Sequence, residues 1–299
     1  MKRTKLQIAS IALAVVAGMT SCKKDDNLNA LSNTAPAKQE VAAAAANPVT
    51  LAAVNTTWTI NWNNRTNGAT YTQSMANTDF GNTTTWYGSG GAYTTNGNNN
   101  TVGCRVTLMP NLDDGGGLIA NSVIGNGTAY EMDYDVKFHS QFNWGKGGKV
   151  GFGFGIGDHN TGGDPGWDGN GGTLRLMWYN TGSRVFFQPY LYYRDQPGQY
   201  GDTFGKSYPS SGSLNKGQWY HVHLYIKSNS GSSTNGHVQI VIDGTVILDT
   251  DIRWTTNDAK RLIDQLTWHT FRGGNDSSWW TTSTDYIYYD NLVIHRISS

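Results

Sequence analysis

The chain has 299 residues, and its 22 Lys and Arg balance 22 Asp and Glu, so its formal net charge at neutral pH is zero. This length suits one sizeable domain, and the absence of a basic excess argues against a nucleic-acid partner. Two cysteines cannot build a disulfide framework, and no phosphate-binding loop or nucleotide fingerprint is present.

Residues 1–21 have the pattern of an export signal. Basic residues precede an apolar run from Ile8 to Val16, and small residues then lead to Cys22. The run is too short for an ordinary membrane-spanning helix. Residues 18–22, with the sequence GMTSC, resemble a bacterial lipobox in which Met19 stands where leucine is usual. The resemblance implies that Cys22 is lipidated, and the alternative is plain secretion with an incidental cysteine.

Residues 22–55 show no periodicity that could support a core, and they are predicted to form a flexible tether. The sequence KKDD at 23–26 resembles the surface-export segment of Bacteroidetes lipoproteins. We therefore expect an outer-membrane lipoprotein exposed at the cell surface. Removing residues 1–21 takes away three basic residues and leaves 19 basic against 22 acidic ones, a formal charge of −3.

From residue 56 onward, glycine, asparagine, threonine and aromatic residues are abundant, and long helical periodicity is nearly absent. Short segments instead alternate between apolar and polar residues, which is the pattern of half-buried strands. Examples are 58–62, 130–138, 219–227 and 285–295. Many such strands joined by Gly and Asn loops predict an all-β fold over residues 56–299, namely a β-jelly roll sandwich of two antiparallel sheets.

A β-hairpin is predicted where Val238–Ile242 runs into Asp-Gly at 243–244 and then into Val246–Leu248. The one weak helical candidate is Asn257–Asp264. The loop at 158–172 is long enough to form the rim of a functional site.

Cys104 is the cysteine that remains in this domain, so no disulfide is expected within it. It lies in the sequence VGCRV at 102–106, where alternation places it with the apolar side chains. We interpret Cys104 as a buried structural thiol rather than a nucleophile.

Eleven tryptophans are many for this length. Trp58, Trp178 and Trp219 lie in predicted strands, and we expect them in or near the core. The tryptophans in Gly-, Asn- and Ser-rich surroundings are Trp144, Trp167, Trp279 and Trp280. Indole rings stack well on sugar rings, since both have an apolar face with polar edges, so these four are candidates for sugar contact or, alternatively, for packing.

A lysine, an arginine and two tyrosines are predicted to face one groove. Side chains alternate across a strand, so Thr173 and Arg175 share one face, and Tyr190 and Tyr192 also point the same way. Lys149 ends a nearby strand-like segment. Fixed cations beside phenols suit a reaction in which a carboxylate is neutralised and a proton moved, which points to acidic polysaccharides.

Three motifs, in their order and spacing, resemble polysaccharide lyase family 14, whose members are alginate and polyuronate lyases. They are KGGK at 146–149 followed by TLRLMW at 173–178, TFRGGNDSSW at 270–279, and YYDNL at 288–292. The resemblance implies a jelly roll with an open cleft and cleavage by β-elimination. The sequence departs from the family pattern at Thr173, where serine is usual, and at 150–153, where VGFG replaces Leu-Pro-Gly-Leu.

The resemblance assigns the catalytic roles to Lys149, Arg175, Tyr190 and Tyr192. Lys149 and Arg175 are candidates for neutralising the uronate carboxylate. The two tyrosines are the favoured base and acid, in either order, and Lys149 as the base stays open. The candidate substrate-binding residues are Thr173, Lys146, His269, Arg272, Trp279 and Trp167.

Alginate is the first expected substrate and glucuronan the second, and we expect a monomer that needs no cofactor. His139 and His159 are further acid–base candidates, and His221 and His223 share a strand face that could hold a metal. A structural Ca²⁺ site is a weaker possibility, with Asp133, Asp135 and Asp290 as its ligands.

Two alternative functions stay open. One is a non-catalytic carbohydrate-binding module that uses the tryptophans of the same jelly roll. The other is a glycoside hydrolase, but this enzyme class needs two carboxylates around the scissile bond. Because Glu131 is the one glutamate after the tether, the sequence argues against a hydrolase.

Overall fold

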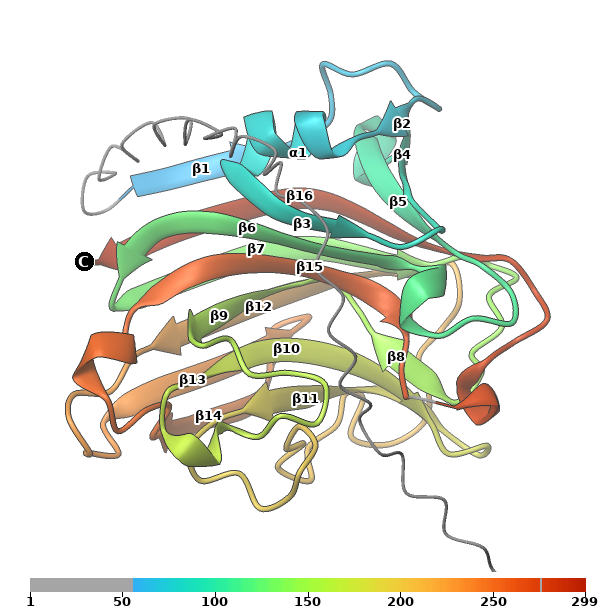
Figure 1. Cartoon of the computed structure of the whole chain (residues 1–299). Coiled ribbons are helices and arrows are strands. Elements are labelled where there is room, and N and C mark those ends of the chain that lie inside the picture. The colour runs from blue at the N-terminus through green and yellow to red at the C-terminus, as the bar shows by residue number, and fades with distance from the viewer. Residues whose placement is uncertain (1–55, 275) are drawn as a thin grey trace, which may run out of the picture. The chain divides into compact units, whose positions relative to one another are not determined.

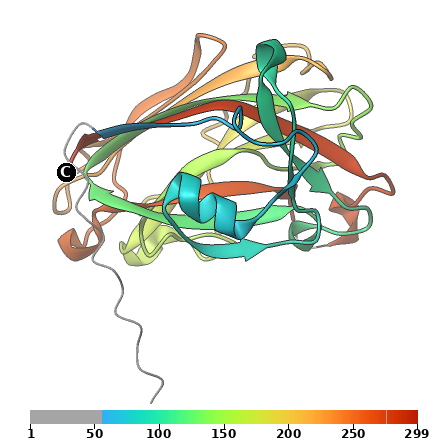
Figure 2. The ribbon, with the colours of Figure 1, turned by 90° about the horizontal axis from the view of Figure 1, so that it is seen from above.

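The computed structural model describes residues 56–274 and 276–299, all of which belong to the unit Pro48–Ser299. The predicted lipidation at Cys22 and the boundaries at residues 21 and 55 lie outside the described residues. The strands of this unit form two antiparallel sheets that lie one over the other (Figures 1 and 2). The predicted β-jelly roll sandwich is therefore confirmed.

The described strands form a nine-stranded and a seven-stranded sheet. The nine-stranded sheet has the order β14 (Thr245–Ile252), β13 (Gly236–Ile242), β12 (Trp219–Lys227), β7 (Ala129–Phe138), β16 (Asp285–Ser298), β5 (Val102–Leu108), β4 (Ala92–Asn96) and β2 (Thr70–Tyr71), with β1 (Thr56–Ile60) beside β16. The seven-stranded sheet has the order β11 (Val185–Tyr192), β10 (Gly171–Asn180), β8 (Gly147–Lys149), β15 (Ile263–Arg272), β6 (Leu118–Gly127) and β3 (Asn82–Tyr87), with β9 (Phe152–Gly157) also paired to β10 and β15.

The core lies between the sheets and is built from every second residue along each strand, whose side chain faces inward. In β10, Leu174, Leu176 and Trp178 are fully buried there, as the alternation predicts. Trp58 packs against this core, as expected. Trp219 does not, because it lies half-exposed on the outer face of the nine-stranded sheet, so its prediction was wrong. Cys104 is fully buried, and burial raises the pKa of its thiol, as expected of a structural cysteine.

The β13–β14 hairpin is confirmed, with Asp243 and Gly244 both at positive φ (48° and 75°) in the turn. The helix expected at 257–264 was wrong, because only the 3₁₀ turn η4 (Asp258–Lys260) forms before β15 begins.

An α-helix occurs instead at α1 (Gln73–Phe80), which begins where the Thr72 side chain accepts a hydrogen bond from the backbone N–H of Met75. Ala76 and Phe80 are the buried residues of this helix. Within the described residues, no helix has the length and apolar character needed to cross a membrane.

Candidate active site

A cavity of about 750 Å³ lies on the outer face of the seven-stranded sheet. Its floor consists of outward-facing residues of β6, β8, β10, β11 and β15, whose neighbours in the sequence face the core. The lining residues are Asp114, Ile119, Asn121, Lys149, His159, Thr161, Gly162, Arg175, Met177, Tyr179, Gln188, Tyr190, Tyr192, Tyr200, Gln265, His269, Phe271, Gly274 and Trp279.

Strand register brings the predicted charged and phenolic groups together. Arg175 pairs with Tyr190 across β10 and β11, and Lys149 of β8 pairs with Met177 of β10. The Nζ of Lys149 lies 4.3 Å from the centre of the Tyr190 ring. The guanidinium carbon of Arg175 lies 5.5 Å from the Tyr190 ring and 5.4 Å from that of Tyr192. An amine, a guanidinium and two phenols therefore share one cavity.

The glycines around Lys149 explain why the lysine occupies this place. Gly148 faces the core, where an added Cβ would lie 2.1 Å from the carbonyl oxygen of Phe271 and 2.2 Å from the Trp178 ring. Gly151 has a φ of +83°, and its N–H donates to the hydroxyl of Tyr289 at 3.0 Å. This conformation interrupts the strand just after Lys149, between β8 and β9. The Gly-Gly before the lysine is thus a packing requirement of β8.

Lys149 is an unusually buried amine. Only 8% of the residue is exposed, and no carboxylate within the described residues forms an ion pair with it. Burial, with a further contribution from the charge of Arg175, lowers the pKa of Lys149 to about 7. A substantial fraction of this amine is therefore neutral at neutral pH and can accept a proton.

Arg175 presents free hydrogen-bond donors inside the cavity. Its Nη1 lies 3.5 Å from Nδ1 of His269, whereas its buried Nε and Nη2 have no partner within the described residues. Unpaired buried donors are costly, and a guanidinium edge matches the two oxygens of a carboxylate. Arg175 is therefore built to receive an anion.

His269 is held as a neutral ring next to Arg175. Burial lowers its pKa, and the charges of Arg175 and Lys149 lower it further. Its Nε2 lies 2.8 Å from Oδ1 of Asn121, so Nε2–H donates to the amide oxygen and Nδ1 is left to accept from Arg175. His269 and Asn121 thereby position the guanidinium.

The two tyrosines have different partners. Burial, with a further contribution from Tyr192, raises the pKa of Tyr190, so its hydroxyl stays protonated. The Tyr192 hydroxyl accepts a hydrogen bond of 3.0 Å from the backbone N–H of Gly163, which belongs to the loop at 158–172. Tyr190, which hydrogen-bonds with Tyr192, thus keeps a proton that it can donate, whereas Tyr192 also anchors the loop.

Some predicted binding residues lie outside the cavity lining. Arg272 is a correction, because it is buried between the sheets, where its Nη2 pairs with the Asp285 carboxylate at 2.6 Å. Thr173 is fully buried and donates to the carbonyl oxygen of Asn160 at 2.9 Å. Trp167 is 48% exposed but is not part of the lining. Lys146 lies at the rim, with its Nζ 4.8 Å from the centre of the Trp279 ring.

The loop at 158–172 does form part of the rim, through His159, Thr161 and Gly162. Nε2 of His159 lies 2.6 Å from the Asp264 carboxylate. His139 lies elsewhere, next to Tyr288 of the nine-stranded sheet. The sequence reasoning missed Asp114, which lies in the 3₁₀ turn η2 (Asp114–Gly116). It also missed Asn121, Gln188 and Gln265, for which only their place in the strand register could have served as a signal.

The metal-site predictions are not supported by the arrangement of the side chains. His221 contacts both Asp133 (3.2 Å) and Asp135 (2.9 Å), and His223 contacts Asp133 (3.0 Å). Asp290 accepts a hydrogen bond from the backbone N–H of Asn98. Across 56–274 and 276–299, no group of three or more His, Cys, Asp or Glu side chains is arranged to hold a metal ion.

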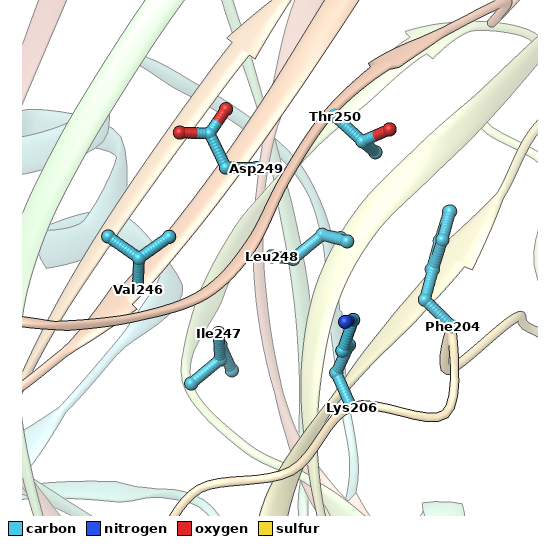
Figure 3. A pocket seen from close by; sticks show the side chains of 7 residues that line it. All are labelled: Phe204, Lys206, Val246, Ile247, Leu248, Asp249 and Thr250. Carbon is cyan, nitrogen blue, oxygen red and sulfur yellow. The ribbon is translucent and has the colours of Figure 1, made fainter.

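A second hollow, of about 350 Å³, lies between β14 and the segment that follows β11 (Figure 3). Phe204 and Lys206 line it from that segment, and residues 246–250 line it from β14. It contains none of the predicted site residues, so the chemistry is assigned to the larger cavity.

The cavity brings an arginine, a lysine of lowered pKa and two tyrosines together on the face of a β-sandwich. This combination defines an enzyme that acts on acidic polysaccharides. The family model of polysaccharide lyase 14 matches residues 111–292, so the chain belongs to this family. It is a polysaccharide lyase, the class of enzyme that cleaves uronate-containing chains by β-elimination. The alternative of a non-catalytic module is not favoured.

Solved structures agree with this assignment. The alginate lyase Aly36B is 60% identical with a TM-score of 0.77, and the match covers 82% of this chain and 99% of that one. A variant of Aly36B in complex with alginate tetrasaccharide is 59% identical, with the same TM-score and coverage. An alginate lyase from Aplysia kurodai is 20% identical with a TM-score of 0.64, covering 79% and 97% of the two chains, and supports the fold. None of the curated proteins matches the chain.

Proposed function

We propose that this lyase cleaves alginate by β-elimination in the cavity around Lys149 and Arg175. The observation that carries the proposal is the unpaired guanidinium edge of Arg175 beside an amine whose pKa lies near 7. The similarity to alginate lyases, one of them in complex with alginate tetrasaccharide, supports alginate as the substrate. Glucuronan is the second candidate.

The first requirement of the reaction is to make the proton at C5 of the uronate acidic. Nε and Nη2 of Arg175 bind the carboxylate next to C5 and stabilise the negative charge that spreads onto it in the transition state. His269 and Asn121 hold the guanidinium in place. The neutral ring of His269 adds no competing positive charge.

The base and the acid are assigned from the lowered pKa of Lys149 and the raised pKa of Tyr190. The neutral amine of Lys149 removes the C5 proton, and the Tyr190 hydroxyl gives its proton to O4 of the leaving sugar. The C5–H and C4–O4 bonds break and a C4–C5 double bond forms. The proton taken by Lys149 is released to solvent, and the Tyr190 phenolate takes up a proton from solvent, so both groups return to their starting states. The pKa directions thus favour Lys149 as the base, in contrast to the tyrosine favoured from the sequence.

A panel of polymers tests the proposed substrate. We expect the purified protein to raise the ultraviolet absorbance of the unsaturated uronate ends on alginate, more weakly on glucuronan, and not on a neutral glucan. Absorbance that rises on neither polyuronate would contradict the proposal. Products cleaved without a double bond would point to hydrolysis.

We also propose that the protein is an outer-membrane lipoprotein attached through Cys22 and acts as a monomer at the cell surface. The lipobox-like residues 18–22 support the anchor. Replacing Cys22 by serine should release the protein from the membrane fraction, and labelling with a radioactive fatty acid should be lost with it.

A further inference from the structure

A row of aromatic and cationic side chains crosses the outer face of the nine-stranded sheet. Strand register places its members side by side on five neighbouring strands, because Tyr93 pairs with Arg105, Arg105 with Tyr288, Tyr288 with Lys137, and Lys137 with Trp219. We call these five residues the aromatic–cation ladder. The strands are β4, β5, β16, β7 and β12, in the order in which they lie in the sheet.

The ladder is accessible from solvent, and all five of its residues are partly exposed. Nζ of Lys137 lies 4.4 Å from the centre of the Trp219 ring and 4.9 Å from that of Tyr288. The guanidinium carbon of Arg105 lies 5.4 Å from the Tyr93 ring. Rings and cations therefore alternate along the row.

The two cations keep their charge available. Among the residues that the structure describes, no carboxylate forms an ion pair with Arg105 or Lys137. Asp135, two residues before Lys137 on β7, is instead engaged by His221, Asn98 and Asn291. The two cations thus contact aromatic rings but have no carboxylate partner among the described residues.

We propose that the aromatic–cation ladder is a second, non-catalytic binding site for an anionic polysaccharide, on the face of the sandwich opposite the cleft. Sugar rings stack on aromatic faces, and uronate carboxylates pair with Arg and Lys. Neighbouring strands lie about 4.8 Å apart, which is close to the length that one sugar adds to a 1,4-linked chain. Successive positions of the ladder are thus spaced like successive sugars, and each ring–cation pair spans about two sugars.

A second site on the same protein would increase its retention on long polymers without changing the chemistry. A long chain, or a network of chains, can occupy both faces, and dissociation from one then leaves the other bound. The choice of alginate as the ligand rests on the proposed function. Short oligosaccharides cannot bridge the two faces, so their turnover in the cleft is independent of the ladder.

The test is retention of the protein in a native gel that contains alginate, with turnover blocked by Lys149→Met. In this background, Trp219→Ala and Lys137→Gln should each weaken polymer binding by about tenfold. Arg105→Gln should act in the same way. In the enzyme that retains Lys149, the same substitutions should leave kcat/KM on a short oligosaccharide unchanged.

Matched controls come from the same strand and face. Tyr225→Ala and Lys227→Ala remove a ring and a cation of β12 that lie outside the ladder, and they should leave retention unchanged. If Trp219→Ala lowers the melting temperature strongly, the proposal is judged from the retention of Lys137→Gln and Arg105→Gln instead.

Unchanged retention in well-folded ladder variants would overturn the proposal. An equal loss of retention in gels that contain a neutral glucan would overturn the claim that the ligand is anionic, since the ladder would then bind sugars regardless of their charge. Failure of the proposed function is a separate result: the wild type would cleave no polyuronate, whereas the dependence of alginate retention on the ladder would still be measurable.

Discussion

Lys149→Met should lower kcat on alginate by at least about 10³-fold while leaving polymer binding largely intact. Methionine has nearly the length of lysine and packs against the same rings, Tyr190 and Phe271. It cannot accept the C5 proton, whereas Arg175 still binds the carboxylate. The loss should therefore appear in kcat rather than in KM, as measured from the initial rate of unsaturated uronate formation.

The same variant should be more stable than the wild type at neutral pH. The pKa of Lys149 is lowered in the folded protein, so the folded state resists protonation and loses stability as the pH falls below the unfolded-state value of about 10.4. The full loss, on the order of 2–5 kcal/mol, is reached below about pH 7. The gain in melting temperature from Lys149→Met should thus be large at about pH 6 and shrink toward about pH 10.

Lys146→Met is the matched control. Lys146 lies three residues before Lys149 at the rim, where its Nζ contacts the Trp279 ring and donates to Ser278. Its replacement should leave kcat within about threefold of the wild type, because the amine does not line the cavity. Near-normal turnover by Lys149→Met would remove the lysine from the chemistry.

Tyr190→Phe should lower kcat by about 10²- to 10⁴-fold with little change in KM. The substitution keeps the ring against Nζ of Lys149 but removes the hydroxyl that protonates O4. Because burial raises the pKa of Tyr190, its proton is present over the working pH range. Steady-state kinetics on alginate measures both constants.

Tyr192→Phe is the natural comparison, since it removes the hydroxyl that accepts the hydrogen bond from Gly163. We expect a smaller loss that is visible mainly in KM, because the loop at 158–172 would be held less firmly over the substrate. A larger kcat loss in Tyr192→Phe than in Tyr190→Phe would exchange the roles of the two tyrosines.

Strand alternation was enough to predict the face shared by Arg175, Tyr190 and Tyr192, because successive side chains of a strand point to opposite faces of the sheet. Alternation alone does not say which of the two faces is the core. Arg272 faces inward from β15, where its charge is paired with that of Asp285, a residue outside the segment at 270–279. Its burial could not be predicted from the segment at 270–279 alone.

The departures from the family pattern have structural explanations. The Thr173 hydroxyl binds the carbonyl oxygen of Asn160, so it ties β10 to the loop at 158–172. Gly151 adopts a positive φ and packs where an added Cβ would lie 2.5 Å from the hydroxyl of Tyr134. Neither residue lines the cavity, so the substitutions leave the reacting groups in place.

The electrostatic character of the site depends on tertiary burial, which the sequence does not specify. A lysine that follows two glycines could be exposed or buried, and it is the burial of Lys149 against Tyr190 and Phe271, together with the charge of Arg175, that lowers its pKa. For the same reason, the base could not be chosen between lysine and tyrosine from the motifs. The aromatic–cation ladder was equally hidden, because its five residues come from five separate strands.

The pH dependence of kcat/KM on alginate tests the central claim that Lys149 acts as the base. The profile reports the free enzyme, so it should rise with pH through a midpoint near the Lys149 pKa of about 7 and then level off. A rate that does not change between about pH 5.5 and about pH 8.5, or one that rises only near the ordinary lysine pKa of about 10.4, would contradict it.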